Sequence, residues 1–380
     1  MFEPFVQFVR QTFGEPEGFI PLHEPRFVGN EKQYVIDAID STFVSSVGRY
    51  VDKFEEQIRD YTGAGYAIAT VNGTASLHIA LLLAGVERND LVLTQPLSFV
   101  ATSNAIAYTS AEPCFIDVDP NTLSLSPDAL TEFLKTQTTL CNGSCYHTAT
   151  GKRISACVPM HTFGHPARIT ELVEMCTAHG IPVVEDAAES LGSTYNGQQT
   201  GTFGLVGTYS FNGNKTITSG GGGMIVTNDE RLGKLAKHLT TQAKVPHRWE
   251  FNHDQTGYNY RLPNLNAALA CAQMEQLGGF IANKRQLASL YQTFFQDYPV
   301  QFVTQPAHSE SNYWLNAILL ADRTERDAFL TYTNDHGIMT RPAWTLLSSL
   351  PMLRHCLTDG GTNAQDIEDR LVNIPSSVRL

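Results

Sequence analysis

The sequence is short of positive charge: 26 lysine and arginine residues stand against 38 aspartate and glutamate residues, which gives a formal net charge of -12. A chain this acidic has no general attraction for nucleic acid or for an anionic membrane surface. The uncharged stretch 91–111 has the length of a membrane span, but it contains Gln95, Pro96, Asn104 and several serines and threonines. It predicts a buried strand, a loop and a helix start. We therefore expect neither a nucleic-acid partner nor a membrane span.

Cysteines are few and scattered. There are seven in 380 residues, an odd number without a disulfide-like framework, which suits a reducing cytoplasm. The N-terminus, MFEPFVQFVRQTFGEPEGF, has acidic residues and prolines where a secretory signal needs a basic start and an apolar stretch. Cys141, Cys145 and His147 lie close together, but no second pair of ligands stands nearby. We predict a polar surface insertion there and no metal site.

No internal repeat or low-complexity linker divides the chain. Between about residues 66 and 227, short apolar runs alternate with helical stretches, as in the predicted helix 169–180 and the strand 181–185 that follows it. This alternation predicts an α/β fold with a mostly parallel sheet covered on both faces. We expect an N-terminal arm at 1–30, a large domain at 31–260, and a small α+β domain at 261–380 that begins with a long or broken helix over 264–298.

The stretch GTYSFNGNKTITSGGGGM, residues 207–224, places Lys215 between a polar turn and four glycines. No neighbour in the sequence is acidic, so we expect the amine to lie among neutral partners, where it loses part of its preference for the charged form. That would prepare it for carbonyl chemistry, although a lysine in an exposed loop is the alternative. A phosphate-binding P-loop is excluded because Asn214 separates Gly213 from Lys215. Glycines 220–223 predict unusual dihedrals or a close approach of another group.

The ends of three other predicted strands present groups that suit one cofactor. Residues 72–75, Asn-Gly-Thr-Ala, open an uncharged helix whose free N–H groups suit a phosphate, although Thr74 could simply cap that helix. Asp186 could keep a proton on a heteroaromatic nitrogen, or could only make local hydrogen bonds. Phe99 offers an aromatic face, or belongs to the core. With Lys215, these are the parts needed to hold pyridoxal 5'-phosphate.

Six motifs resemble, in order and spacing, those of the DegT/StrS-type sugar aminotransferases: VNGTASLHIALLLAGV, PLSFVATSNAI, FIDVDPNTLSL, VVEDAAESLGS, GTYSFNGNKTITSGGGGMIVTND and GYNYRLPNLNAAL. The resemblance runs from about Pro21 into the C-terminal part. It implies a pyridoxal-phosphate enzyme of fold type I, the aspartate aminotransferase fold. Segments 20–55 and 337–352 are similar to the LegC-like branch, which aminates UDP-linked 4-keto-6-deoxy-N-acetylhexosamines for legionaminic acid or bacillosamine-type diamino sugars.

The resemblance also implies roles for individual residues. Lys215 matches the Schiff-base lysine, and Asp186 matches the acid that faces the pyridine nitrogen. The other implied cofactor contacts are Thr74, Ala75 and Ser210 at the phosphate, Phe99 stacked on the ring, and Glu189, which stands where many relatives carry Gln or His near the ring hydroxyl. Asn259 matches an asparagine that reaches the phosphate of the neighbouring subunit, which implies a homodimer with shared active sites. Candidates for the sugar or nucleotide pocket are Ser46, His161, Tyr313, Trp314 and Arg341.

By the same resemblance, the amino group would pass from L-glutamate to C4 of a UDP-linked keto-sugar. A dTDP- or GDP-linked acceptor is the alternative. A dehydratase on this fold would carry a histidine in place of Lys215. A cofactor-binding regulator without turnover is the rival from another class, and nothing in the intact set of Lys215, Asp186 and phosphate cup favours it.

Overall fold

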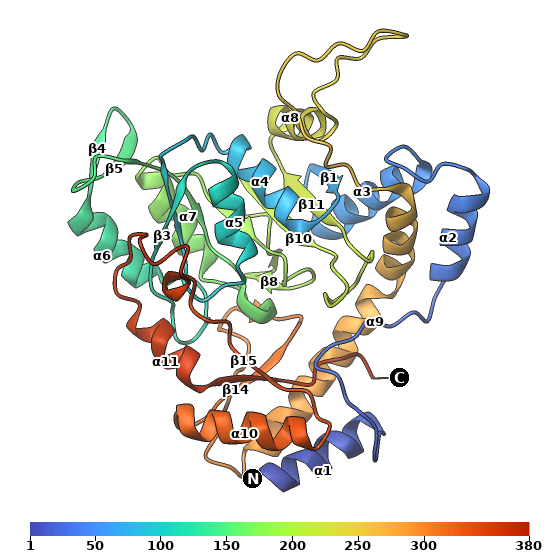
Figure 1. The fold of residues 1–380 in the computed structure, drawn as a ribbon, viewed down its shortest axis with the longest axis vertical. Coiled ribbons are helices and arrows are strands. Elements are labelled where there is room, and N and C mark those ends of the chain that lie inside the picture. The colour runs from blue at the N-terminus through green and yellow to red at the C-terminus, as the bar shows by residue number, and fades with distance from the viewer. Residues whose placement is uncertain (380) are drawn as a thin grey trace.

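A computed structural model describes residues 1–379 (Figure 1). Leu380, the last residue of the predicted small domain, lies outside the described residues. The central sheet has the strand order β3-β2-β6-β7-β10-β11-β1, in which isolated pairings of Cys157 with Val183 and of Met160 with Asp186 join β6 to β7. Its strands are β1 (Tyr66–Thr70), β2 (Leu91–Thr94), β3 (Glu112–Phe115), β6 (Arg153–Val158), β7 (Val184–Asp186), β10 (Val206–Ser210) and β11 (Gly223–Thr227).

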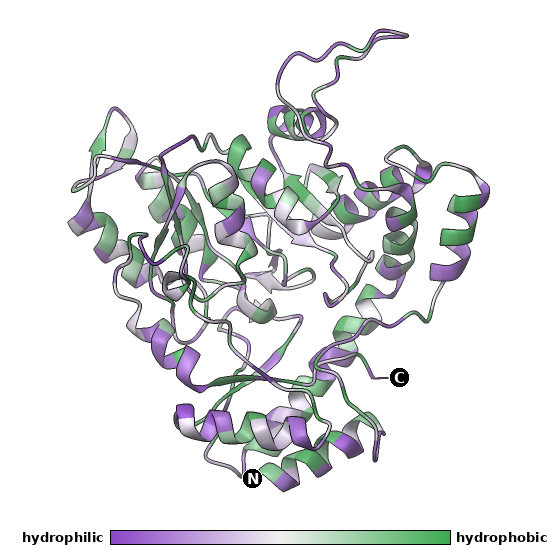
Figure 2. Ribbon diagram, in the orientation of Figure 1, coloured by the Kyte–Doolittle hydropathy of each residue, from purple (hydrophilic) through white to green (hydrophobic). Residues whose placement is uncertain are grey.

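Adjacent strands of this sheet run parallel except at β11, which is antiparallel to both β10 and β1. The predicted mostly parallel sheet is therefore confirmed. Successive residues of each strand point to opposite faces, because the side-chain period of a strand is two. Ala67 and Ala69 of β1 join one hydrophobic cluster, whereas Ile68 between them joins another. Both faces of the sheet are thus buried, and Figure 2 shows the central strands as mostly hydrophobic.

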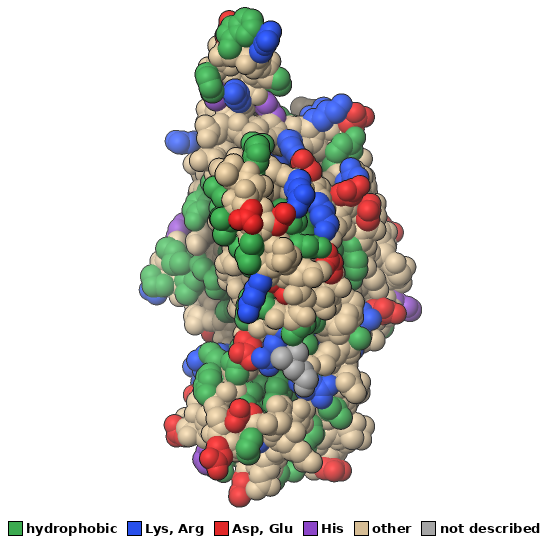
Figure 3. Space-filling model, turned by 90° about the vertical axis from the view of Figure 1, so that its right-hand side faces the viewer, with side chains coloured by type: hydrophobic (Ala, Val, Ile, Leu, Met, Phe, Trp, Pro, Cys, Tyr) green, Lys and Arg blue, Asp and Glu red, His purple; other side chains and the backbone are tan. Residues whose placement is uncertain are grey.

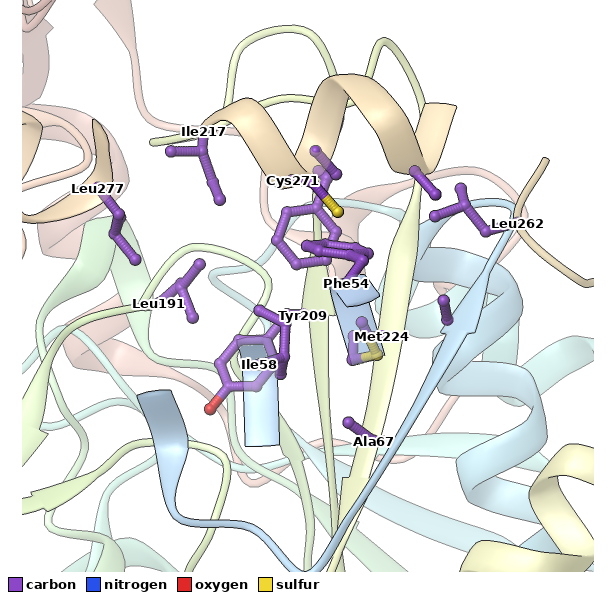
Figure 4. Packing of buried hydrophobic residues seen from close by; sticks show 14 of the residues in the cluster. Phe54, Ile58, Ala67, Leu191, Tyr209, Ile217, Met224, Leu262, Cys271 and Leu277 are labelled. Atoms are coloured by element: carbon purple, nitrogen blue, oxygen red, sulfur yellow. The ribbon is translucent and has the colours of Figure 1, made fainter. Parts of the chain in front are cut away.

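Helices cover each face. One face carries α3 (Arg49–Thr62) and the first half of α9 (Asn264–Phe295), and Figure 4 shows how Phe54, Ile58, Tyr209 and Met224 pack there. The opposite face carries α4 (Gly73–Leu83), α5 (Ala101–Tyr108) and α8 (Glu230–Thr240). Two further helices, α6 (Pro127–Gln137) and α7 (Ile169–Ala178), cover the β2, β3 and β6 end of the sheet. In the described part of the chain, no helix has the length and apolar character that crossing a bilayer requires.

The segment with Cys141, Cys145 and His147 is an antiparallel hairpin at the edge of the sheet. Its strands are β4 (Thr138–Cys141) and β5 (Ser144–His147), and β5 pairs with the start of β6. The ring of His147 stacks on Phe133 of α6, at a centroid distance of 6.1 Å. Within residues 1–379, no group of three His, Cys, Asp or Glu side chains gathers as metal ligands do. The hairpin is a structural extension of the sheet.

The C-terminal part forms a second, antiparallel sheet in the order β12-β14-β16-β15. Its elements are β12 (Gln301–Phe302), β14 (Asn316–Leu319), α10 (Arg323–Asp335), β15 (Arg341–Pro342), α11 (Thr362–Arg370) and β16 (Leu371–Ile374). A small three-stranded sheet joins β13 (Ser309–Glu310) to β8 (Thr194–Tyr195) and β9 (Gln198–Gln199) of the large part. Short 3-10 turns lie at Thr162–Gly164 and Leu347–Ser349. The predicted α+β character is observed, while the boundary at 260 stays a prediction.

The first helix, α1 (Phe2–Phe13), packs on this C-terminal part. The ring of Phe5 is fully buried against Phe329 of α10 and Phe295 of α9, at centroid distances of 5.0 and 5.8 Å. The chain then rises along the molecule to α2 (Glu31–Asp40), which packs on α9 (Figure 1). Because α9 is one unbroken helix that contributes to the buried clusters of both parts, it fixes how the two parts meet.

Candidate active site

The carboxyl ends of the central strands meet at a cavity of about 340 Å³. Parallel strands deliver the residues that follow them to the same edge of a sheet, where ligands of α/β proteins bind. In this sheet Asp186 pairs with Thr208, while Ser210 and Thr70 both pair with Gly223. Seven residues proposed from the sequence line the cavity: Thr74, Phe99, Asp186, Glu189, Ser210, Lys215 and Trp314.

The start of α4 forms one wall of the cavity. The Asn72 side chain caps the helix by accepting the Ala75 N–H at 2.7 Å, so the N–H groups of Gly73 and Thr74 are left at the open end of the first turn. Two glycines let this turn lie against the strands. A Cβ on Gly73 would lie 2.8 Å from Ser210 Cβ, and a Cβ on Gly223 would lie 2.4 Å from the Asn72 carbonyl oxygen. The positive end of the α4 dipole and the Ser210 hydroxyl together suit a phosphate.

Asp186 lies at the end of β7 and is buried. Thr102 Oγ1 donates a hydrogen bond to its Oδ2 at 2.8 Å, and the Ala188 N–H donates to its Oδ1 at 3.2 Å. Burial raises the pKa of the Asp186 carboxyl, although the two hydrogen bonds and the Lys215 charge oppose that shift. A buried carboxylate of this kind gains most from a cationic partner, such as a protonated ring nitrogen.

Lys215 has an acidic partner, so the expectation of wholly neutral surroundings is wrong. Its Nζ lies 3.3 Å from Glu189 Oε1, and Glu189 Oε2 accepts the Phe163 N–H at 2.9 Å. Glu189 follows β7 by three residues and is folded back to the lysine, a contact that the local sequence of Lys215 does not contain. Burial raises the pKa of the Glu189 carboxyl, and the nearby Lys215 charge opposes the shift.

Aromatic rings form the remaining walls. Lys215 Nζ lies 3.9 Å from the centroid of the Trp314 ring. Phe99 lines the opening and is half exposed, at 50% of its surface. Trp344, which the sequence reasoning missed, also lines the cavity and packs on Phe163 at a centroid distance of 5.0 Å. Phe99 is therefore available to a flat ligand and is not a core residue.

Four of the five proposed substrate residues do not line this cavity. The ring of His161 is fully buried, where its Nδ1 accepts the Ala167 N–H and its Nε2 lies 3.0 Å from Glu185 Oε2. Tyr313 is buried in the C-terminal cluster, and its hydroxyl accepts the Gln305 N–H at 3.0 Å. Arg341 is exposed and donates to Asn334 Oδ1, while Ser46 lies in the loop before α3. We assign none of these four to the substrate.

Two proposed cofactor contacts lie outside the lining of this chain's own cavity. Ala75 uses its N–H on Asn72, as described above. Asn259 lies in the exposed segment between α8 and α9 and is paired with Thr241 through a backbone bridge.

The cavity has further lining residues that the sequence reasoning did not name for the site: Gly222, Met160, Asn212, Asn214, Thr102 and Trp344. Thr102 had a usable signal, because it follows Phe99 by one turn at the start of an expected helix.

The residues present fit pyridoxal 5'-phosphate in three independent respects. The open turn of α4, pressed against Ser210 with no room for a Cβ at Gly73, forms a cradle for a phosphate. Asp186 is a buried carboxyl at the side of the cavity, and Lys215 extends an amine into it. A phosphate, a basic ring nitrogen and an aldehyde on one flat ring require this donor set.

Comparisons with known proteins agree with this geometry. Residues 25–380 match the profile of the DegT/DnrJ/EryC1/StrS aminotransferase family. The chain is 36% identical to a GDP-perosamine synthase of Escherichia coli O157:H7, over 94% of this chain and 93% of that protein. It is also 36% identical to the putative pyridoxal phosphate-dependent aminotransferase EpsN of Bacillus subtilis, over 95% and 92%. The crystal structure of the aminotransferase TlmJ from Streptoalloteichus hindustanus superposes with a TM-score of 0.85 at 26% identity, covering 94% of each chain.

Proposed function

Because this chain belongs to the DegT/DnrJ/EryC1/StrS aminotransferase family, whose members depend on pyridoxal phosphate, we propose that it transfers an amino group from L-glutamate to the C4 ketone of a nucleotide-linked 4-keto-6-deoxy sugar. The observation that carries the proposal is the meeting of Lys215 and Asp186 in one cavity, beside the open turn of α4. When bound, the cofactor supplies a ring that accepts an electron pair from the α carbon of the donor.

Each residue of the site would have a separate role in this reaction. Lys215 would hold the cofactor covalently and, when free, would take up and return the proton of the donor's α carbon through Nζ. Asp186 would keep a proton on the ring nitrogen, since a buried carboxylate favours a neighbouring cation. Gly73, Thr74 and Ser210 would bind the phosphate, and Phe99 would cover the ring. A histidine-dependent dehydratase does not fit, because the reacting position carries Lys215.

Two nucleotides are candidates for the acceptor. Segments 20–55 and 337–352 resemble the LegC-like branch and support a UDP-linked N-acetylhexosamine, with a product of the legionaminic acid or bacillosamine type. Relatives named GDP-perosamine synthase, which are 36%, 35% and 32% identical to this chain, support a GDP-linked sugar. The seven cysteines are free thiols, which supports a reaction in a reducing compartment such as the cytoplasm.

We also propose that the active site belongs to a homodimer. Asn259 does not line the cavity of its own chain, which suits a residue that serves a second copy. The segment after α8 projects from the body in Figure 1 and exposes Trp249 and Phe251 by 69% and 78%. Apolar side chains are also exposed on and after α2, namely Ile36, Ile39, Phe43, Val44 and Val47. Figure 3 shows hydrophobic side chains on this face and at the projecting tip, and a second copy would cover them.

The test is to incubate the protein, loaded with pyridoxal phosphate, with L-glutamate and either the UDP-linked or the GDP-linked 4-keto-6-deoxy sugar. We expect stoichiometric 2-oxoglutarate and amino-sugar with one of the two, identified by mass spectrometry. Release of 2-oxoglutarate with a dTDP-linked sugar alone would move the assignment to that nucleotide. If the protein binds the cofactor but shows no turnover with any acceptor, the alternative of a catalytically inactive, cofactor-binding regulator would be favoured.

A further inference from the structure

Trp314 contacts Lys215 and also the residue before it, Asn214, and neither contact requires a substrate. The face of its ring lies 3.9 Å from Lys215 Nζ, within the range of a cation–π contact. Its indole N–H donates to the carbonyl oxygen of Asn214, the residue before the lysine, at 2.6 Å. Trp314 is itself buried, at 4% exposure. One side chain thus holds both the backbone that leads into Lys215 and the amine at the end of its side chain.

Glu189 forms the other side of the site in which the Lys215 amine lies. Its Oε1 lies 3.3 Å from Lys215 Nζ, and its other oxygen is fixed by the Phe163 N–H at 2.9 Å. The lysine side chain is 14% exposed and that of Glu189 is 2% exposed. The amine therefore lies between a carboxylate and an aromatic face. Little water reaches it, so neither contact is much weakened by hydration.

Asn312 links the two residues that contact the amine, Trp314 and Glu189, through hydrogen bonds to their backbones. Its Oδ1 accepts the backbone N–H of Trp314 at 2.8 Å, and its Nδ2 donates to the carbonyl oxygens of Glu189 and Leu191 at 2.9 Å each. The same Nδ2 lies 3.4 Å from Oγ1 of Thr216, the residue after the lysine. Asn312 is fully buried, so these bonds satisfy it within the protein.

The backbone is strained to allow this arrangement. Tyr313, between Asn312 and Trp314, has a left-handed φ of 48°, which costs a non-glycine residue free energy. Gly164 makes room opposite, since a Cβ there would lie 1.9 Å from Asn312 Oδ1. Strain of this kind persists only where the surrounding contacts hold the residue in that conformation, and such residues cluster at functional sites.

We propose that Trp314 is a positioning residue for Lys215, which holds the amine beside Glu189 whenever it is not bonded to the cofactor, and that Asn312 fixes Trp314 in that place. This inference rests on the proposed function, and it replaces the sequence-based expectation that Trp314 contacts the sugar. It adds no covalent step. It assigns the position of Nζ between taking up the donor's proton and returning it, beside Glu189 and the Trp314 ring.

The first test needs neither cofactor nor substrate. In protein labelled with [13C-ε]lysine and freed of cofactor, the ring current of Trp314 should shift the Lys215 Cε–H resonance upfield, with the signal assigned by its loss in Lys215→Arg. Trp314→Leu should return the resonance to the position of exposed lysines, whereas Trp314→Phe should keep part of the shift. A wild-type resonance at the exposed position, or a shift unchanged in Trp314→Leu, overturns the inference.

The second test separates positioning from substrate binding. With L-glutamate alone, Trp314→Leu should slow the half-reaction by about 10- to 100-fold, the size expected for a misplaced catalytic group. It should leave KM for glutamate near its wild-type value and enlarge the isotope effect of [2-2H]glutamate, whereas Trp314→Phe should stay close to wild type. If Trp314→Leu keeps the wild-type rate of the glutamate half-reaction and raises only the KM for the keto-sugar, Trp314 is a sugar contact and the proposal is overturned. If wild-type protein makes no 2-oxoglutarate, the proposed function fails, while the resonance test still decides where Lys215 lies.

Discussion

Gly73, the first residue of α4, faces Ser210 at the end of β10 so closely that a Cβ on Gly73 would lie 2.8 Å from Ser210 Cβ and 3.1 Å from its hydroxyl oxygen. The two residues are far apart in sequence but meet where the sheet and the helix start converge. Their contact sets the width of the proposed phosphate cradle, because the N–H groups of the first turn and the Ser210 hydroxyl lie on either side of it.

Gly73→Ala should weaken cofactor binding without unfolding the protein. The added methyl group must push the α4 turn away from Ser210, and overpacking of this kind costs about 1–3 kcal/mol. If the cost falls on the phosphate site, affinity for pyridoxal phosphate should fall by about 10- to 100-fold in a fluorescence titration. Gly278→Ala in α9 is the control, since no atom lies within 4 Å of a Cβ built there. Equal affinities for the two variants would argue against a phosphate at this turn.

Lys215→Ala should lose the covalent link to the cofactor. Borohydride treatment followed by mass spectrometry should find the reduced cofactor attached in the wild type and absent from the variant, and the visible band of the bound cofactor should change accordingly. Turnover should fall by at least about a hundredfold, the lower range for removal of a general acid–base group. Lys135→Ala changes an exposed lysine of α6 and should leave both properties intact. A covalent adduct in Lys215→Ala would place the link on another lysine.

Much of the site could be predicted because its members directly follow strands. Asp186, Ser210 and Thr74 follow or close apolar runs that form central strands, and a parallel sheet brings such residues to one edge whatever the loops do. The fold class, the presence of a long helix after residue 264 and the covering helices follow from periodicity, although that periodicity left open whether α9 is broken. These features depend on local pattern, which one sequence contains.

The contacts that depend on loop direction could not be predicted. Trp314 and His161 both follow buried apolar residues, so the sequence does not distinguish them as candidates for the site. Trp314 lines the cavity, whereas both ring nitrogens of His161 are used within the protein, by Glu185 and the Ala167 N–H. Left-handed residues lie close to both candidates, Phe163 with a φ of 56° and Tyr313 with a φ of 48°, and no propensity indicates them. Glu189 reaches Lys215 from the turn that follows β7, 26 residues away in sequence.

Asp186→Asn should separate stability from activity. Burial raises the pKa of this carboxyl in the folded protein, so its contribution to stability is present below the unfolded pKa and is lost as pH rises through the folded pKa. Without cofactor at neutral pH, the variant should therefore unfold at the same temperature as the wild type or higher. The glutamate half-reaction should slow by about a hundredfold or more, as for loss of one electrostatic partner. Thr102→Val, which removes only one hydrogen bond to Asp186, should have a smaller effect; a half-reaction at the wild-type rate in Asp186→Asn would remove its proposed role.

Mixing two inactive variants should restore activity if subunits share active sites. Lys215→Ala and Asn259→Ala homodimers should each be weak, because every site lacks one group. After unfolding and refolding together, half of the dimers are mixed and half of their sites are intact, which predicts about a quarter of wild-type activity. A mixture no more active than its components would mean that Asn259 does not serve the neighbouring cavity.

Lys284→Met should flatten the pH dependence of stability. Lys284 of α9 is fully buried and donates to the Ser376 carbonyl, and burial lowers the pKa of its amine from 10.5 to about 7. Between those two values the unfolded chain binds a proton that the folded chain does not, so the free energy of unfolding should rise with pH by about 1.4 kcal/mol per unit.

That rise should be absent from Lys284→Met in urea unfolding of the cofactor-free protein across this window, and present in Lys135→Met, which alters an exposed lysine. The buried ring of His23 has a pKa that burial, and then the Lys284 charge, lower well below its ordinary 6.5. It therefore titrates below this window, and the difference in slope reports Lys284. Parallel slopes in wild type and Lys284→Met would mean that Lys284 keeps its charge in the folded protein. Because Ser376 follows β16 and Lys284 belongs to α9, a neutral amine at this contact joins the end of the chain to the helix that spans both parts of the molecule without burying a charge.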